Sequence, residues 1–227
     1  MRAFLLAALV VGVCHAQIPA PRIDLPSMGG GDYAMPVTSI KQERQASTLL
    51  QQYDFSCGSA AIATLLTYQY GYPITERAVF DEMYAHGDQA KIQREGFSLL
   101  DMKRFLADHG FDADGFNQPL DKLSEAHVPA IVLINQNGYH HFVVIKGLHA
   151  DRVLIGDPAR GTRAMPRAAF EAIWESHLLF VIHNRMDKAR FNLAADWRAA
   201  PHSPLSAGIE RAGLGGITLP KLGPGAF

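Results

Sequence analysis

The sequence predicts an α+β fold in which N-terminal helices pack on an antiparallel sheet. The first half of the chain places apolar residues at helical spacing, in stretches bounded by capping and stop residues. The second half instead contains short apolar runs separated by turn residues, as buried strands do. Helices followed by an antiparallel meander are typical of the α+β class. The 227 residues are 48% hydrophobic, which is enough apolar material for one domain with a sizeable core.

Helical patterns extend to about residue 110. A run of good helix formers begins at Cys57, and Gly71 is suited to the position just after its end. Thr75 can cap a second helix, while Ser98 with Asp101 forms an approximate capping box for a third. The expected helices cover residues 57–70, 76–86 and 98–109.

Apolar runs and turn signals dominate the second half of the chain. Residues 129–135 are almost entirely apolar and end at Asn135, and Gln136-Asn137-Gly138 is a hairpin connection to the next strand. Pro166 stands at a position suited to the start of a helix. The elements expected here are strands over 111–116, 129–135, 139–147, 152–158 and 178–183, a helical turn over 120–126 and a helix over 166–175.

The N-terminal residues 1–16 have the pattern of a signal peptide. Arg2 supplies the positive charge, residues 4–11 are apolar but too few to span a bilayer, and small residues precede a cleavage site after Ala16. We therefore expect a periplasmic protein without stable membrane insertion. This segment contains Cys14, so the mature chain would carry Cys57 as its single thiol.

Both flanks of the predicted domain, residues 45–184, differ from it in composition. Residues 17–44 are rich in proline and glycine at their start and predict an extended leader or linker, with an edge strand over 37–45. Residues 185–227 lose hydrophobic periodicity and predict a largely unstructured Pro/Gly-rich tail, with a short helix around 191–198.

The overall charge and residue types exclude several classes of partner. A formal net charge of -1 gives no electrostatic footprint for nucleic acid. The ten histidines include no pair at helical ligand spacing, and no second cysteine is available in the mature chain. We therefore expect neither a metal nor another cofactor.

Cys57 is the leading candidate for a nucleophile. A thiol in the first turn of a helix meets the positive end of the helix dipole, which favours the reactive thiolate. Gly58 would leave the approach to the sulfur open, and Gln51 can bring an amide beside the Cys57 backbone N–H as an oxyanion hole. An unpaired cysteine in an exported protein also favours reactivity. A buried structural cysteine and an intermolecular disulfide are the alternatives.

A cysteine nucleophile needs a base and a residue that orients the base. Strand alternation places His140 and His141 on opposite faces, so only one of them can face the helix of Cys57. Both faces are apolar, and periodicity therefore does not choose between the two histidines. Asp157 ends the next strand and could hold the imidazole in one tautomer, as the third member of a triad does.

Four motif positions in order resemble the bacteriocin-processing, or double-glycine leader, cysteine peptidase family. They are Gln51-x5-Cys57-Gly58, His141-Phe142-Val143-Val144 and Asp157-Pro158, within about residues 45–184. The sequence is most similar to the stand-alone exported members, including the peptidase of functional-amyloid secretion systems. The resemblance implies a papain-like fold with Cys57 as nucleophile, His141 as general base and acid, Asp157 as orienting residue and Gln51 as oxyanion donor.

This resemblance implies an exported cysteine endopeptidase. Its polypeptide substrate would be a secreted or periplasmic protein, with an amyloid subunit or an export partner as the candidates. Better-known members are domains fused to export ATPases that cut after Gly-Gly in leader peptides, whereas for this sequence we expect a signal peptide and no ATPase domain. The alternatives are a papain-like cell-wall amidohydrolase and a non-catalytic substrate-binding module of a secretion system.

Overall fold

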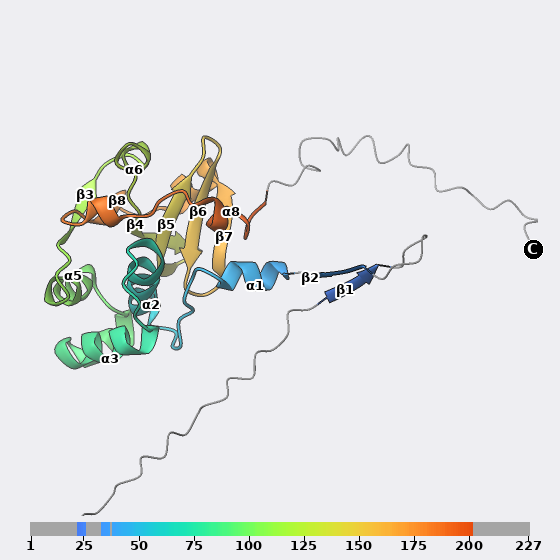
Figure 1. Cartoon of the computed structure of the whole chain (residues 1–227). Helices are drawn as coiled ribbons and strands as arrows, with labels where there is room; N and C mark the ends of the chain where they lie inside the picture. Colours follow the sequence, from blue (N-terminus) through green and yellow to red (C-terminus); the bar gives the residue numbers. More distant parts are fainter. Residues whose placement is uncertain (1–21, 26–32, 37, 202–227) are drawn as a thin grey trace, which may run out of the picture. The chain divides into compact units, whose positions relative to one another are not determined.

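The structure, a computed structural model, describes residues 22–25, 33–36 and 38–201, and the chain divides into two units. The first unit contains strands β1 (Arg22–Leu25) and β2 (Tyr33–Pro36), which pair antiparallel. The second unit begins at Ile40 and contains the other described elements (Figure 1). The predicted signal peptide lies outside the described residues.

The second unit is built on a six-stranded antiparallel sheet with the spatial order β3-β8-β4-β5-β6-β7. Strands β4 to β7 follow one another as hairpins, while β8 returns to the opposite side of β4 and pairs with β3. The predicted α+β arrangement is therefore confirmed. The strands are β3 (Ala113–Asn117), β4 (Ala130–Gln136), β5 (Tyr139–Leu148), β6 (Arg152–Asp157), β7 (Gly161–Pro166) and β8 (Leu178–Ile182).

The helix that begins at Cys57 is confirmed, and it ends in one wider turn, the π-helix η1 (Leu65–Gln69). The capping predictions also hold. Thr75 accepts a hydrogen bond from the Ala78 N–H, and Ser98 and Asp101 form a reciprocal capping box. The helices of this part of the chain are α2 (Cys57–Thr64), α3 (Glu76–His86), α4 (Gln89–Glu95), α5 (Leu99–Asp108), α6 (Asp121–Ala126) and α7 (Arg167–Ile173).

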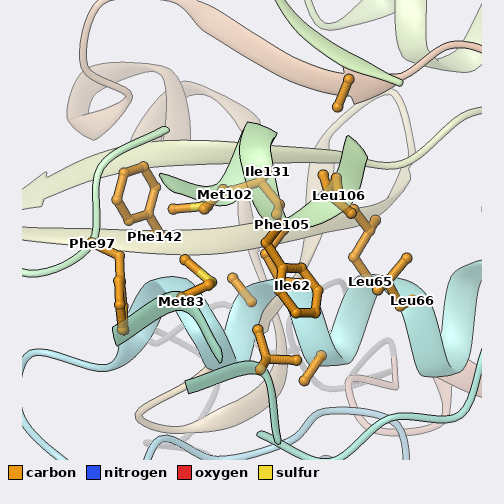
Figure 2. Packing of buried hydrophobic residues seen from close by; sticks show 14 of the residues in the cluster. Ile62, Leu65, Leu66, Met83, Phe97, Met102, Phe105, Leu106, Ile131 and Phe142 are labelled. Atoms are coloured by element: carbon orange, nitrogen blue, oxygen red, sulfur yellow. The ribbon is translucent and has the colours of Figure 1, made fainter. Parts of the chain in front are cut away.

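Two apolar clusters cover the two faces of the sheet. The first joins α2, α3 and α5 to one face, and the second joins α6 and α7 to the other. Strand β5 serves both clusters, because Phe142 and Val144 belong to the first while Val143 and Ile145 belong to the second. Figure 2 shows the first cluster, with Ile62, Leu65, Leu66, Met83, Phe97, Met102, Phe105, Leu106, Ile131 and Phe142 labelled.

The edge strand predicted over residues 37–45 is wrong. Ile40–Gln45 form helix α1, which contacts β7 and belongs to the second unit. Five of its six residues are polar with long, unbranched side chains, which favour a helix over a strand. A single apolar residue provides no alternating pattern for a half-buried strand. The folded body therefore begins before the boundary predicted at residue 45.

Helix α4 and strand β7 were not predicted, and the pairing of β1 with β2 in the predicted leader was not predicted either. Helix α4 buries only Ile92, so it shows no apolar stripe, although Asp88 caps it by accepting a hydrogen bond from the Lys91 N–H. Strand β7 contains no apolar run and is held instead by continuous pairing with β6. Both α4 and β7 depend on neighbours that a local pattern does not reveal.

Residues 185–201, which we name the C-terminal strap, are folded against the rest of the second unit. The Arg190 N–H donates to the Gln69 carbonyl at 2.8 Å, and the Asn192 N–H donates to the Lys146 carbonyl at 2.8 Å. The strap contains η2 (Met186–Lys188) and α8 (Ala194–Trp197), the latter within the short helix expected there. The unstructured tail predicted from residue 185 thus does not describe this part, and residues 202–227 lie outside the described residues.

Candidate active site

Cys57 is the first residue of α2 and is a free, buried cysteine that is 8% exposed. The turn before it is fixed by Ser56, whose hydroxyl accepts a hydrogen bond from the Tyr53 N–H at 3.1 Å. The Ser59 hydroxyl then bonds both the Ser56 carbonyl at 2.9 Å and the Glu76 carboxyl at 3.0 Å. Hydrogen bonds of the Ser56 and Ser59 side chains therefore fix the turn that positions the thiol.

Gly58 has a packing role that the sequence did not predict. A Cβ atom at this position would lie 3.0 Å from both Phe97 Cβ and Met102 Cε. Glycine therefore allows the start of α2 to lie directly against these two side chains. Close packing, rather than an open approach to the sulfur, is the reason for glycine that the structure provides.

His141 and Asp157 form a buried pair beside this thiol. His141 Nε2 donates to Asp157 Oδ1 at 2.9 Å, and the two residues are only 3% and 1% exposed. The Cys57 side chain is near enough to the imidazole to raise the pKa of His141. Because Nε2 is occupied by Asp157, Nδ1 is the ring nitrogen left for the thiol, and it is buried without a hydrogen-bond partner among the described residues.

The charges of this pair are strongly coupled. Burial alone would lower the pKa of His141, but the hydrogen bond to Asp157 and the neighbouring Cys57 raise it to about 9. Burial would likewise raise the pKa of Asp157, but the bond to His141 and the charge of Arg163 hold it at about 2. An imidazolium and a carboxylate are thus the forms that this site favours at neutral pH.

His140 lies outside this cluster. Its side chain is exposed, and its Nδ1 pairs with Glu175 Oε2 at 2.6 Å. Between the two histidines that the sequence offered, only His141 meets Asp157 and Cys57.

Gln51 joins the site through its backbone and its side chain. Its N–H donates to the Pro158 carbonyl at 2.9 Å, which ties the loop before Cys57 to the residue after Asp157. Its side-chain Nε2 donates to the carbonyls of Tyr53 at 3.0 Å and Asp54 at 3.4 Å. The amide is therefore near the nucleophile turn, with its donors directed at loop carbonyls in this structure.

Two further side chains reach the site without having been predicted. The Tyr139 ring stacks on His141 at a centroid distance of 5.5 Å. Arg163 Nε bonds Asp157 Oδ2 at 3.0 Å. The hairpin formed by β6 and β7 could have indicated Arg163, because Asp-Pro-Ala-Arg-Gly is a turn sequence that returns the chain beside Asp157.

The described residues include no group of three or more His, Cys, Asp or Glu side chains placed to hold a metal ion. In the same part of the chain, no helix has the length and apolar character needed to cross a bilayer.

The coupled pair predicts a pH dependence of stability. Because the folded-state pKa of His141 is raised, its stabilising contribution is fully present below the unfolded value of about 6.5 and is lost as the pH rises through about 9. We expect the Tm to fall over this window and the fall to be smaller in His141→Gln. Thermal unfolding followed by circular dichroism measures this, with His140→Gln as the matched control. An equal fall in wild type and His141→Gln would contradict the prediction.

The chain is similar to several known proteins. The model of the Peptidase C39 family matches residues 45–186. The chain is 36% identical over 208 residues to the probable functional amyloid protease FapD of Pseudomonas aeruginosa, covering 91% of this chain and 88% of that protein. It is 38% identical over 179 residues to the protein of the same name from Pseudomonas fluorescens, covering 79% and 76%.

A solved structure with the same fold is the peptidase domain of Streptococcus ComA, a bifunctional ABC transporter involved in quorum sensing. It matches with a TM-score of 0.50 and 20% identity, covering 60% of this chain and 97% of that domain. This similarity concerns the fold alone, and it confirms the papain-like peptidase architecture that the sequence resemblance implied.

Proposed function

This chain belongs to the Peptidase C39 family and is a cysteine peptidase, and we propose that it cuts an exported polypeptide with Cys57 as nucleophile, His141 as general base and acid, and Asp157 as the orienting residue. The observation that carries this proposal is the buried 2.9 Å bond between His141 and Asp157 beside the Cys57 thiol. A buried acid and base that are hydrogen-bonded to each other beside a buried thiol provide the parts that nucleophilic catalysis needs.

The proposed reaction is acyl transfer in two steps. Transfer of the Cys57 thiol proton to His141 Nδ1 gives the imidazolium that the site favours, and the sulfur then attacks the peptide carbonyl. The C–N bond then breaks as the imidazolium passes its proton to the leaving amine, which leaves a thioester on Cys57. In the second step His141 takes a proton from water, the resulting hydroxide displaces the sulfur, and the carboxylic acid product departs. Throughout, Asp157 holds Nε2 so that Nδ1 stays directed at the sulfur.

Gln51 would stabilise the negative oxygen that forms in both steps. Its backbone is fixed near Asp157 by the bond to the Pro158 carbonyl, and its amide lies in the turn that leads to Cys57. For this role Nε2 must exchange its bond with the Tyr53 carbonyl for one with the oxyanion, beside the Cys57 N–H.

We further propose that the substrate is a component of an amyloid-export system and that the enzyme acts in the periplasm. The supporting observations are the similarity to two probable functional amyloid proteases across most of both chains and the signal-peptide pattern of residues 1–16. Both an amyloid subunit and an export partner are candidate substrates of such an enzyme.

The catalytic assignment is tested by covalent labelling. A peptidyl chloromethyl ketone ending in Gly-Gly should alkylate Cys57 stoichiometrically, because the imidazole activates the thiol and the site holds the peptide. Peptide mass spectrometry identifies the labelled residue. We expect His141→Ala to slow labelling at least about 100-fold, in the range that general-base catalysis supplies. Equal labelling rates in wild type and His141→Ala would refute the assignment.

The substrate assignment is tested by incubating purified enzyme with each candidate polypeptide and recording intact masses. A cut that wild type makes and Cys57→Ala does not make would support it. Release of fragments from peptidoglycan, with no cut in any candidate polypeptide, would instead point to the amidohydrolase alternative.

A further inference from the structure

The Asp157 carboxylate has a second ionic partner besides His141. Its Oδ1 accepts hydrogen bonds from His141 Nε2 and from the Ala159 N–H, each at 2.9 Å, while its Oδ2 accepts from Arg163 Nε at 3.0 Å. The two oxygens are therefore divided, one toward the imidazole and the other toward the guanidinium. Rotation of the carboxylate would break bonds on both sides at once.

The β6–β7 hairpin explains why Arg163 reaches this position. Asp157 pairs with Gly161, and Ile155 pairs with Arg163. Arg163 is thus a diagonal neighbour of Asp157 on the same face of two adjacent strands, within reach for a long side chain. Gly161 has φ +80°, and a Cβ there would lie 2.5 Å from the Arg44 carbonyl oxygen, so the tight return of the chain depends on glycine.

We propose that Arg163 is a positioning residue for the proposed peptidase chemistry. It holds the Asp157 carboxylate with Oδ1 toward His141, and its positive charge partly offsets the negative charge of Asp157 beside the imidazole. This inference rests on the proposed roles of Cys57, His141 and Asp157. It adds a residue that lies outside the four motif positions and does not touch the thiol.

The burial of Arg163 argues for more than a packing role. Its side chain is 18% exposed, and its Nη2 atom is buried without a hydrogen-bond partner among the described residues. Removing a guanidinium from water is costly, and an apolar residue of similar size often stabilises such a position equally well. The effect of the guanidinium on Asp157 explains why a charged residue occupies this position despite the cost of burying it.

The charge of Arg163 and its hydrogen bond should affect different measured quantities. Loss of its positive charge would leave the full charge of Asp157 to act on His141, which stabilises the imidazolium and raises the pKa of His141. Loss of its hydrogen bond would free the carboxylate to rotate, which misdirects the imidazole and slows the attack of the sulfur. Arg163→Met removes both contributions, whereas Arg163→Lys keeps the charge and changes the geometry.

The test uses the full chain and two readouts. NMR titration of labelled histidine follows the midpoint of His141, and alkylation by the Gly-Gly chloromethyl ketone gives the rate constant and half-saturating concentration at Cys57. For Arg163→Met we expect the midpoint to rise by about 0.5–1 pH unit and the rate constant to fall about tenfold, with the half-saturating concentration unchanged. Arg163→Lys should keep the wild-type midpoint and lose rate. Arg160→Gln, in the adjacent exposed turn, is the matched control and should change neither readout.

A folded Arg163→Met protein with the wild-type midpoint and alkylation rate would overturn the proposal. The proposal would also be overturned if the alkylation rate of Arg163→Met fell only in proportion to its unfolded fraction, as measured by circular dichroism. If the proposed roles of Cys57, His141 and Asp157 are wrong, the result is different. Wild type and His141→Ala would then be alkylated at Cys57 at the same rate, whatever the Arg163 variants do.

Discussion

Replacing Cys57 with alanine should abolish peptide-bond hydrolysis, with kcat/KM falling by at least about 10⁴-fold, as loss of a catalytic nucleophile does. The described chain offers no second thiol, since Cys57 is the free cysteine in it. The remaining groups can bind and polarise a substrate but cannot form the thioester. Hydrolysis of a quenched fluorescent peptide, or of the natural substrate once it is found, measures the loss.

Matched variants separate chemistry from folding in this experiment. Gln51→Ala should lower kcat by about 10²–10³-fold, the range for loss of one oxyanion donor. His140→Ala, which alters the exposed neighbour of the proposed base, should leave activity near that of wild type. Activity that persists in a folded Cys57→Ala protein would contradict the proposed mechanism, because that mechanism has no other nucleophile.

Lys146→Met should destabilise the protein by about 3–5 kcal/mol, the cost of leaving a buried charge without its partner. Lys146 is fully buried in β5, and its Nζ pairs with Asp196 Oδ1 of the C-terminal strap at 3.0 Å. The same Nζ donates to the Ser47 carbonyl at 2.7 Å. Burial lowers the pKa of Lys146 against the opposing effect of Asp196. Lys146 of β5 therefore links the strap, through the ion pair, to the segment that leads into Gln51, through the bond to Ser47.

Urea unfolding measures this effect, and a double variant tests its cause. Lys146→Met with Asp196→Leu removes both charges and should recover most of the lost stability, because no unpaired charge remains. Arg77→Gln breaks the exposed pair with Asp81 and should leave the urea midpoint nearly unchanged. If Lys146→Met unfolds at the wild-type midpoint, the ion pair does not secure the strap.

Local patterns were sufficient for much of the fold. The capping box of Ser98 and Asp101 and the cap at Thr75 depend on residues three positions apart, so the sequence alone locates these helix starts. Elements held by distant partners were missed or misassigned. Strand β7 exists through its pairing with β6, α1 was mistaken for a strand, and the strap is fixed by residues such as Asn192 that bond to β5.

The sequence by itself determined the α+β order of elements and predicted Gln51, Cys57 and Asp157 as site residues, since spacing and residue type are local properties. Its pattern left His140 and His141 open, and only the family resemblance favoured His141. Tertiary structure decided which histidine meets the thiol. Alternation groups His140 with Phe142 and Val144, which pack in the cluster of α2, yet His141 is the residue beside Cys57. The reason is that the site forms where the start of α2 meets the start of β5 and the end of β6. At such a junction the neighbours of a side chain depend on how three segments pack together, and not on the face of a single strand.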